Sequence, residues 1–175
     1  MTFLDIVLDL IDRRTFGSLW FWIALGLCWT SVSYRVLGVP WDVVVRARRC
    51  TNGAAMRDFE DMVRINTNRL LLLAQEAGPI GAGLVSFLLT SLGLLGFGYG
   101  VEFAQAVFLL GLPLTGVGLL SLRAAQAIRA GALSGEALVA RIGRHRLAVR
   151  LIGAVSIFVT ALWGMYHNMN TSVLG

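Results

Sequence analysis

Four long apolar runs dominate this chain, at residues 16–37, 79–99, 103–122 and 147–166. The hydrocarbon core of a bilayer is about 30 Å thick, and about 20 helical residues are enough to cross it. Hydrophobic residues make up 57% of the 175 positions and charged residues 14%, whereas a soluble domain has roughly 45–50% and about 25%. We therefore predict an all-α integral membrane protein, a single membrane domain over residues 1–175 with four transmembrane helices.

The second and third runs are separated by residues 100–102 alone. One unbroken helix over 79–122 would be about 60 Å long, twice the thickness of the bilayer core. Gly96, Gly98 and Gly100 precede Glu102 at this point, and clustered glycines interrupt helices. We therefore predict a tight hairpin between two separate crossings.

Arginine predicts the orientation of the four crossings. All 15 cationic side chains are arginine, with six between residues 38 and 78, five between 123 and 146, and none in the hairpin. Basic loops of membrane proteins stay in the cytoplasm. We therefore predict a multi-pass protein of a bacterial inner membrane, with cytoplasmic loops at 38–78 and 123–146 and with both termini periplasmic.

Both cytoplasmic loops are predicted to contain helices. The first helix covers residues 54–77, ends at Gly78–Pro79, and gains an i, i+4 ion pair between Glu60 and Arg64. Its apolar side is formed by Met56, Phe59, Val63, Leu70 and Leu73. In the second loop, Ser134 is expected to cap a helix that runs through Glu136 and continues into the fourth span.

The N-terminal segment is predicted to be a short interfacial helix over residues 2–12. Asp5, Asp9 and Asp12 share one face of it. A cleavable signal peptide carries positive charge at this position and ends in small residues. We therefore expect the segment to remain in the mature protein.

Small residues recur along the predicted spans at helical spacing, which lets membrane helices approach closely. Two interpretations remain open: packing within one four-helix bundle, or docking against the helices of another integral membrane protein. The candidate interface positions are Gly93, Gly96, Gly100, Gly111, Gly116, Ser156, Thr160 and Gly164.

Arginines close to the ends of the spans are candidate ligands for anionic lipid headgroups. The same side chains also act as ordinary positive-inside signals. With a net charge of +5 interleaved with apolar runs, the chain is expected to meet anionic membrane lipid and no nucleic acid. The candidate positions are Arg46, Arg48, Arg49, Arg141, Arg144, Arg146 and Arg150.

The sequence contains no arrangement typical of catalysis or metal binding. It lacks the serine-hydrolase elbow, the zinc-protease helix motif and the phosphate-binding loop. Cys28 and Cys50 lie at different predicted depths, and His145 and His167 on opposite sides of the membrane, so neither a disulfide nor a bis-histidine haem is expected. Glu102 is expected to be a solvated interfacial side chain. We predict no enzyme activity, cofactor, metal or small-molecule substrate.

The segment SLWFWIALGLCWTSVSYRVLGVPWDVVVRARR, from Ser18 to Arg49, resembles a family of alphaproteobacterial four-helix membrane proteins. Members are sometimes labelled as a component of the SUF iron–sulfur assembly complex. The resemblance covers chiefly this segment and the general layout, and it includes no catalytic motif. It implies a link to cluster assembly and, from the purple-bacterial character of the family, a bioenergetic membrane partner.

Three functions are compatible with these features. The first is a non-catalytic accessory subunit or assembly factor of a larger bacterial inner-membrane complex. The second is a small homo-oligomeric channel or transporter, which requires polar residues along a shared path. The third is pigment or quinone binding. The absence of catalytic motifs and the abundance of small residues in the spans favour the first.

Overall fold

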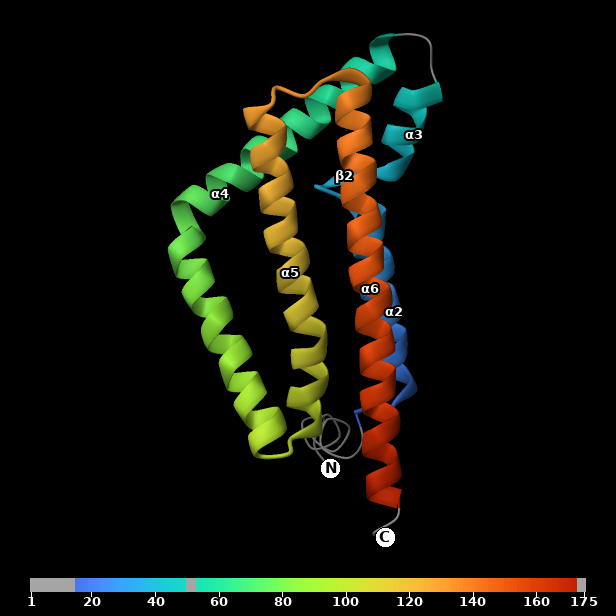
Figure 1. The fold of residues 1–175 in the computed structure, drawn as a ribbon, viewed down its shortest axis with the longest axis vertical. Coiled ribbons are helices and arrows are strands. Elements are labelled where there is room, and N and C mark those ends of the chain that lie inside the picture. Colours follow the sequence, from blue (N-terminus) through green and yellow to red (C-terminus); the bar gives the residue numbers. More distant parts are fainter. Residues whose placement is uncertain (1–14, 50–52, 173–175) are drawn as a thin grey trace, which may run out of the picture.

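The computed structural model describes residues 15–49 and 53–172 of the chain, which form a helical bundle (Figure 1). The predicted helix at 2–12 and Cys50 lie outside the described residues. The elements, in chain order, are α2 (Leu19–Tyr34), β1 (Arg35–Val36), β2 (Val39–Pro40), α3 (Trp41–Arg49), α4 (Gly53–Gly93), the π-helix η1 (Leu94–Gly98), α5 (Glu102–Ala130) and α6 (Gly135–Ser172).

Among the described residues, three helical segments are long and apolar enough to cross a membrane: Gly53–Gly98, Glu102–Ala130 and Gly135–Met169. They contain the second, third and fourth predicted spans. The sharp hairpin between the second and third is also present, with Gly100 at a φ of +74°. As predicted, α6 has Glu136 in its first turn and continues unbroken into the last apolar run.

The first apolar run forms a shorter helix than predicted. The 16 residues of α2 end at Tyr34 and span about 24 Å at 1.5 Å per residue. A tight β-hairpin follows, in which Val36 pairs with Val39. Leu37 and Gly38 form its turn with φ angles of 52° and 76°, the geometry of a two-residue hairpin turn. Figure 1 shows α2 lying along α6, and the two helices are in contact.

The prediction that a helix ends at Gly78–Pro79 is wrong, because α4 passes through both residues without interruption. Pro79 cannot donate its backbone amide, and its ring crowds the carbonyl one turn earlier, which bends a helix. Figure 1 shows α4 bending between an upper limb (residues 53–78) and a lower limb (residues 79–93). One helix therefore supplies both the predicted cytoplasmic helix and the second span.

The two arginine-rich segments form a packed head at one end of the bundle. The end that carries the turn at 99–101 is called the far end below. The head brings together the β-hairpin, α3, the upper limb of α4, the end of α5 and the start of α6. Its buried core comprises Val36, Leu37, Val39, Val44, Ala47, Phe59, Val63, Leu71, Ala124, Ala125, Ile128, Leu138, Val139 and Ile142. The predicted loops are therefore a structured unit.

The upper limb of α4 faces this core largely along the predicted line, since Phe59 and Val63 are buried and Met56 and Leu70 pack against the core. Its buried residues are Phe59, Val63, Thr67 and Leu71, at successive spacings of four, whereas Leu73 is 54% exposed. The polar pairing also differs, because Arg64 contacts Asp61 at 2.9 Å. Glu60 instead accepts a hydrogen bond of 2.6 Å from the Gly135 amide, which satisfies a free N–H at the start of α6.

A smaller apolar cluster lies inside the bundle, below the head. Leu25 and Trp29 from α2 pack there with Val117 from α5 and Val149 from α6. All four side chains are less than 10% exposed. This cluster separates the polar groups near the head from those at the far end.

Candidate functional site

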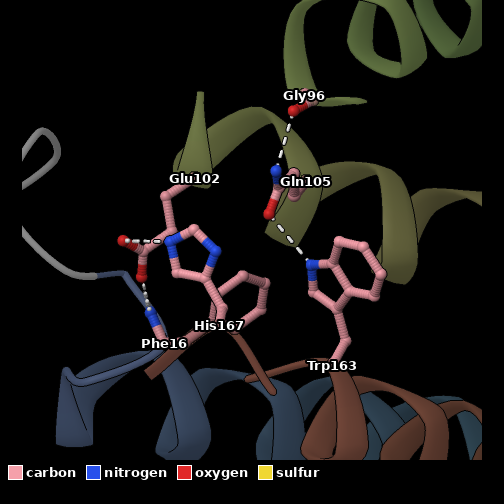
Figure 2. A network of polar contacts seen from close by, with 6 residues as sticks. All are labelled: Phe16, Gly96, Glu102, Gln105, Trp163 and His167. Atoms are coloured by element: carbon pink, nitrogen blue, oxygen red, sulfur yellow. Dashed lines mark hydrogen bonds and ion pairs between the residues drawn. The ribbon is translucent and has the colours of Figure 1, made fainter. Parts of the chain in front are cut away.

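The far end contains a buried polar network built around two residues of the first turn of α5 (Figure 2). Glu102 accepts a 2.6 Å hydrogen bond from the Phe16 amide, and its other oxygen lies 3.5 Å from His167 Nε2 on α6. The Glu102 side chain is only 14% exposed. The prediction of a solvated carboxylate is therefore wrong, because a backbone amide 86 positions away covers it.

Gln105 links α5 to two further elements of the same network (Figure 2). Its Nε2 donates to the Gly96 carbonyl at 2.7 Å, and its Oε1 accepts from Trp163 Nε1 at 2.9 Å. The π-helix widens the backbone here, with Tyr99 N–H bonded to the Leu94 carbonyl. An unpaired buried carbonyl costs about 1–3 kcal/mol, so the hydrogen bond from the Gln105 amide stabilises the widened turn.

The network holds several elements of the bundle together. Phe16 is 2% exposed, and its carbonyl accepts a hydrogen bond from Trp22 Nε1 at 3.0 Å. The contacts of Phe16 and Glu102 connect three parts of the bundle: the start of α2, the start of α5 and the end of α6. We therefore assign the network a structural role at the far end.

Most of the candidate small residues face other parts of the same chain. A Cβ added to Gly93 would lie 3.4 Å from the Phe108 ring, and one added to Gly111 would lie 3.5 Å from Leu89. A Cβ at Gly164 would lie 3.3 Å from Phe16.

The remaining positions of that set divide into buried and open ones. Ser156 and Thr160 are 6% and 1% exposed, and neither hydroxyl has a hydrogen-bond partner among the described residues. A Cβ at Gly96 would lie 2.8 Å from the Gln105 backbone nitrogen, whereas Gly100 and Gly116 face open space.

The candidate arginines are distributed around the head. Arg46, Arg48 and Arg49 are exposed along α3, and Arg144 is exposed on α6. Arg141 is partly buried, with its Nε lacking a hydrogen-bond partner in the described part of the chain. Arg146 and Arg150, one turn apart on α6, line a groove against α2.

Arg146 is the most constrained of the candidate arginines. Its guanidinium carbon lies 3.8 Å from the centre of the Trp41 ring, within range of a cation–π interaction. Its Nε donates to the Ser33 carbonyl at 3.4 Å. These contacts join α6 to α3 and to the end of α2. This stack could not be predicted from local sequence, since 105 residues separate the two partners.

The two histidines occupy opposite ends of α6. His145 is 6% exposed and lies 3.2 Å from the Ser121 hydroxyl, whereas His167 belongs to the far-end network. Their separation of 22 positions corresponds to about 33 Å of helix. No group of three or more potential metal ligands occurs among residues 15–49 and 53–172.

Comparison with known proteins adds no further constraint, because no family model, curated protein or solved structure matches the chain.

Proposed function

We propose that the protein is a non-catalytic accessory subunit or assembly factor of a larger bacterial inner-membrane complex. The observation that carries this proposal is the large exposed surface of the lower limb of α4. In the most apolar window of that segment only 6% of the residues are buried, although the limb packs along α5. Its exposed surface includes Gly83, Ser86 and Thr90. Small residues of this kind let a second membrane helix approach closely.

We further propose that the chain crosses the membrane four times, with α2 as the first crossing. Figure 1 shows that α2 and the lower limb of α4 lie along the same stretch of the bundle. This arrangement supports placing both helices at the same depth in the membrane. The head carries the exposed arginines and would lie in the cytoplasm. The turn at 99–101 and both termini would then be periplasmic.

This orientation is tested by labelling single cysteines in a chain whose two natural cysteines are replaced by serine. A membrane-impermeant maleimide added to spheroplasts should label Val101→Cys and leave Arg144→Cys unlabelled until the cells are lysed. The opposite pattern would reverse the orientation. Labelling of both in intact spheroplasts would contradict a membrane-spanning arrangement.

A homo-oligomeric channel or transporter receives less support. The apolar cluster that contains Trp29 and Val149 lies between His145 near the head and Thr160 toward the far end. A continuous polar path within one copy of the described chain is therefore interrupted. A conducting pore would need a path shared between several copies.

The partner is tested by placing a photo-crosslinking amino acid at Ser86. We expect a defined heteromeric adduct in native membranes, and a matching stoichiometric complex after purification in mild detergent. Phe158, which is 64% exposed on α6, is the control position and should give no such adduct. A lone chain by native mass would overturn the proposal, and an adduct between two copies would favour the channel. Following the sequence resemblance, the first partners to examine are bioenergetic complexes and the iron–sulfur assembly machinery.

A further inference from the structure

A groove of about 510 Å³ runs between α2 and α6 at the junction of the head and the spans. Its rim toward the head is formed by Arg146 and Arg150, and the next two turns of α6 add Gly153 and Ile157. Neither arginine forms an ion pair with a carboxylate among the described residues. The groove therefore presents two positive charges without a carboxylate partner above a trough that is mostly apolar and also includes Thr30, Ser33 and Tyr34.

The shape of the trough depends on two glycines. Gly153 lets α6 approach the Trp29 indole, because a Cβ at this position would lie 2.8 Å from the ring. Gly26 leaves the α2 side open, since a Cβ there would have no atom within 4 Å. The ring of Trp29 forms part of the lining.

The positive rim is held in place before any ligand binds. Trp41 stacks on the Arg146 guanidinium, and the Ser33 carbonyl accepts its Nε–H. An arginine already ordered by its neighbours loses less conformational entropy on binding an anion. Arg150 is exposed one turn further along α6 and can adjust to the bound group.

We infer that this groove binds one anionic phospholipid, with its phosphate between Arg146 and Arg150 and an acyl chain along Gly26, Trp29 and Ile157. The inference rests on the membrane placement proposed above. Along α6, the charged part of the lining lies nearest the head and the apolar part follows toward the far end. A phospholipid has the same order, with a charged headgroup followed by an apolar acyl chain. A second groove of about 390 Å³, between α5 and α6, is lined by apolar residues and Ser156 alone. It lacks a cation that would select an anionic lipid.

The charge requirement is tested by native mass spectrometry of the purified full-length protein titrated with phosphatidylglycerol or phosphatidylcholine. An arginine beside an anionic headgroup raises affinity on the order of fivefold. The double variant Arg146→Gln/Arg150→Gln should therefore lower phosphatidylglycerol affinity about 30-fold and leave phosphatidylcholine binding unchanged. Arg144→Gln, which removes an exposed arginine of the same helix, should have little effect. Equal losses in the two variants would overturn a specific site.

The trough is tested by Gly26→Leu, which keeps both arginines and adds a side chain on the groove side of α2, where its Cβ would have no atom within 4 Å. We expect it to abolish selective phosphatidylglycerol binding, while Gly118→Leu, at a glycine that also has no neighbour within 4 Å, preserves it. Retained selectivity in Gly26→Leu would refute the acyl-chain placement.

Soluble glycerol phosphate and inorganic phosphate distinguish a lipid from a free phosphate. If either binds as tightly as phosphatidylglycerol, the groove is an anion site and the lipid assignment is wrong. Failure here is separable from failure of the proposed function, because the Ser86 adduct and the native mass of the complex report on the partner alone.

Discussion

Replacing Gly96 by alanine tests whether the contact between η1 and α5 stabilises the far end. The new Cβ would lie 2.8 Å from the Gln105 backbone nitrogen, whereas ordinary contact begins at 3.4 Å. The nearest atom belongs to the backbone, so α5 and η1 must separate by about 0.6 Å. Overpacking of this kind costs about 1–3 kcal/mol.

The separation would also weaken the 2.7 Å hydrogen bond from Gln105 to the Gly96 carbonyl, which contributes about 0.5–1.5 kcal/mol. We expect these two losses to lower the free energy of unfolding of Gly96→Ala by about 1.5–4.5 kcal/mol, less up to about 1 kcal/mol regained through the better helix propensity of alanine. The measurement is reversible unfolding in mixed micelles titrated with a denaturing detergent.

Gly98→Ala is the matched control for this experiment. It changes a glycine in the same π-helix, has no atom within 4 Å of the added Cβ, and has no positive φ to strain. Its stability should be unchanged or raised by up to about 1 kcal/mol, because alanine is the better helix former. Equal losses in the two variants would refute the close-contact explanation.

Three further stability changes follow from contacts in the head and the bundle, and the same unfolding assay checks them. Glu60→Ala should cost about 1 kcal/mol, because it removes the acceptor at the start of α6, while exposed Asp58→Ala should change stability by less than about 0.5 kcal/mol. Gly153→Ala should cost about 1–3 kcal/mol through its clash with the α2 indole, and Gly143→Ala, which meets no atom within 4 Å, should cost nothing. Glu102→Ala should cost about 1–3 kcal/mol, and Glu102→Gln less, since an amide oxygen still accepts the hydrogen bond. A loss in Glu102→Gln equal to that in Glu102→Ala would argue against the amide contact.

The elements that could be predicted are those set by local composition. Hydrophobic length places the second, third and fourth apolar runs on helices, because each segment contains enough apolar residues to span a bilayer core. The turn after Gly100 was predictable because glycines cluster where the apolar run is too long for one crossing. Glu136 indicated the start of α6 through its position at a helix N-terminus.

The features that could not be predicted depend on contacts between distant residues. Leu37 adopts a positive φ, a conformation that a leucine in the sequence does not indicate. Val36 and Val39 on either side of this turn are buried in the head core. Pro79 is compatible both with a new helix and with a bend in an old one, and the packing of both limbs of α4 decides between them. The burial of Glu102 depends on an amide 86 positions away.

The glycines illustrate the same division between local and distant information. Spacing identified Gly93, Gly96 and Gly164 as points of close approach, and each faces a neighbour within 3.4 Å of an added Cβ. The spacing did not identify those neighbours, because close packing inside the chain and close packing against a partner require the same small residue.

The composition of the head core has a consequence for biosynthesis. Translation produces α3 and α4 before α6, yet Leu138, Val139 and Ile142, which complete the core, belong to α6. A nascent chain that has not reached Gly135 therefore leaves Phe59, Val63 and their apolar neighbours without the cover that α6 provides. Exposed apolar surface of this kind attracts chaperones or aggregates. The chain must therefore be synthesised through Ile142 before the head core around α3 and α4 can close.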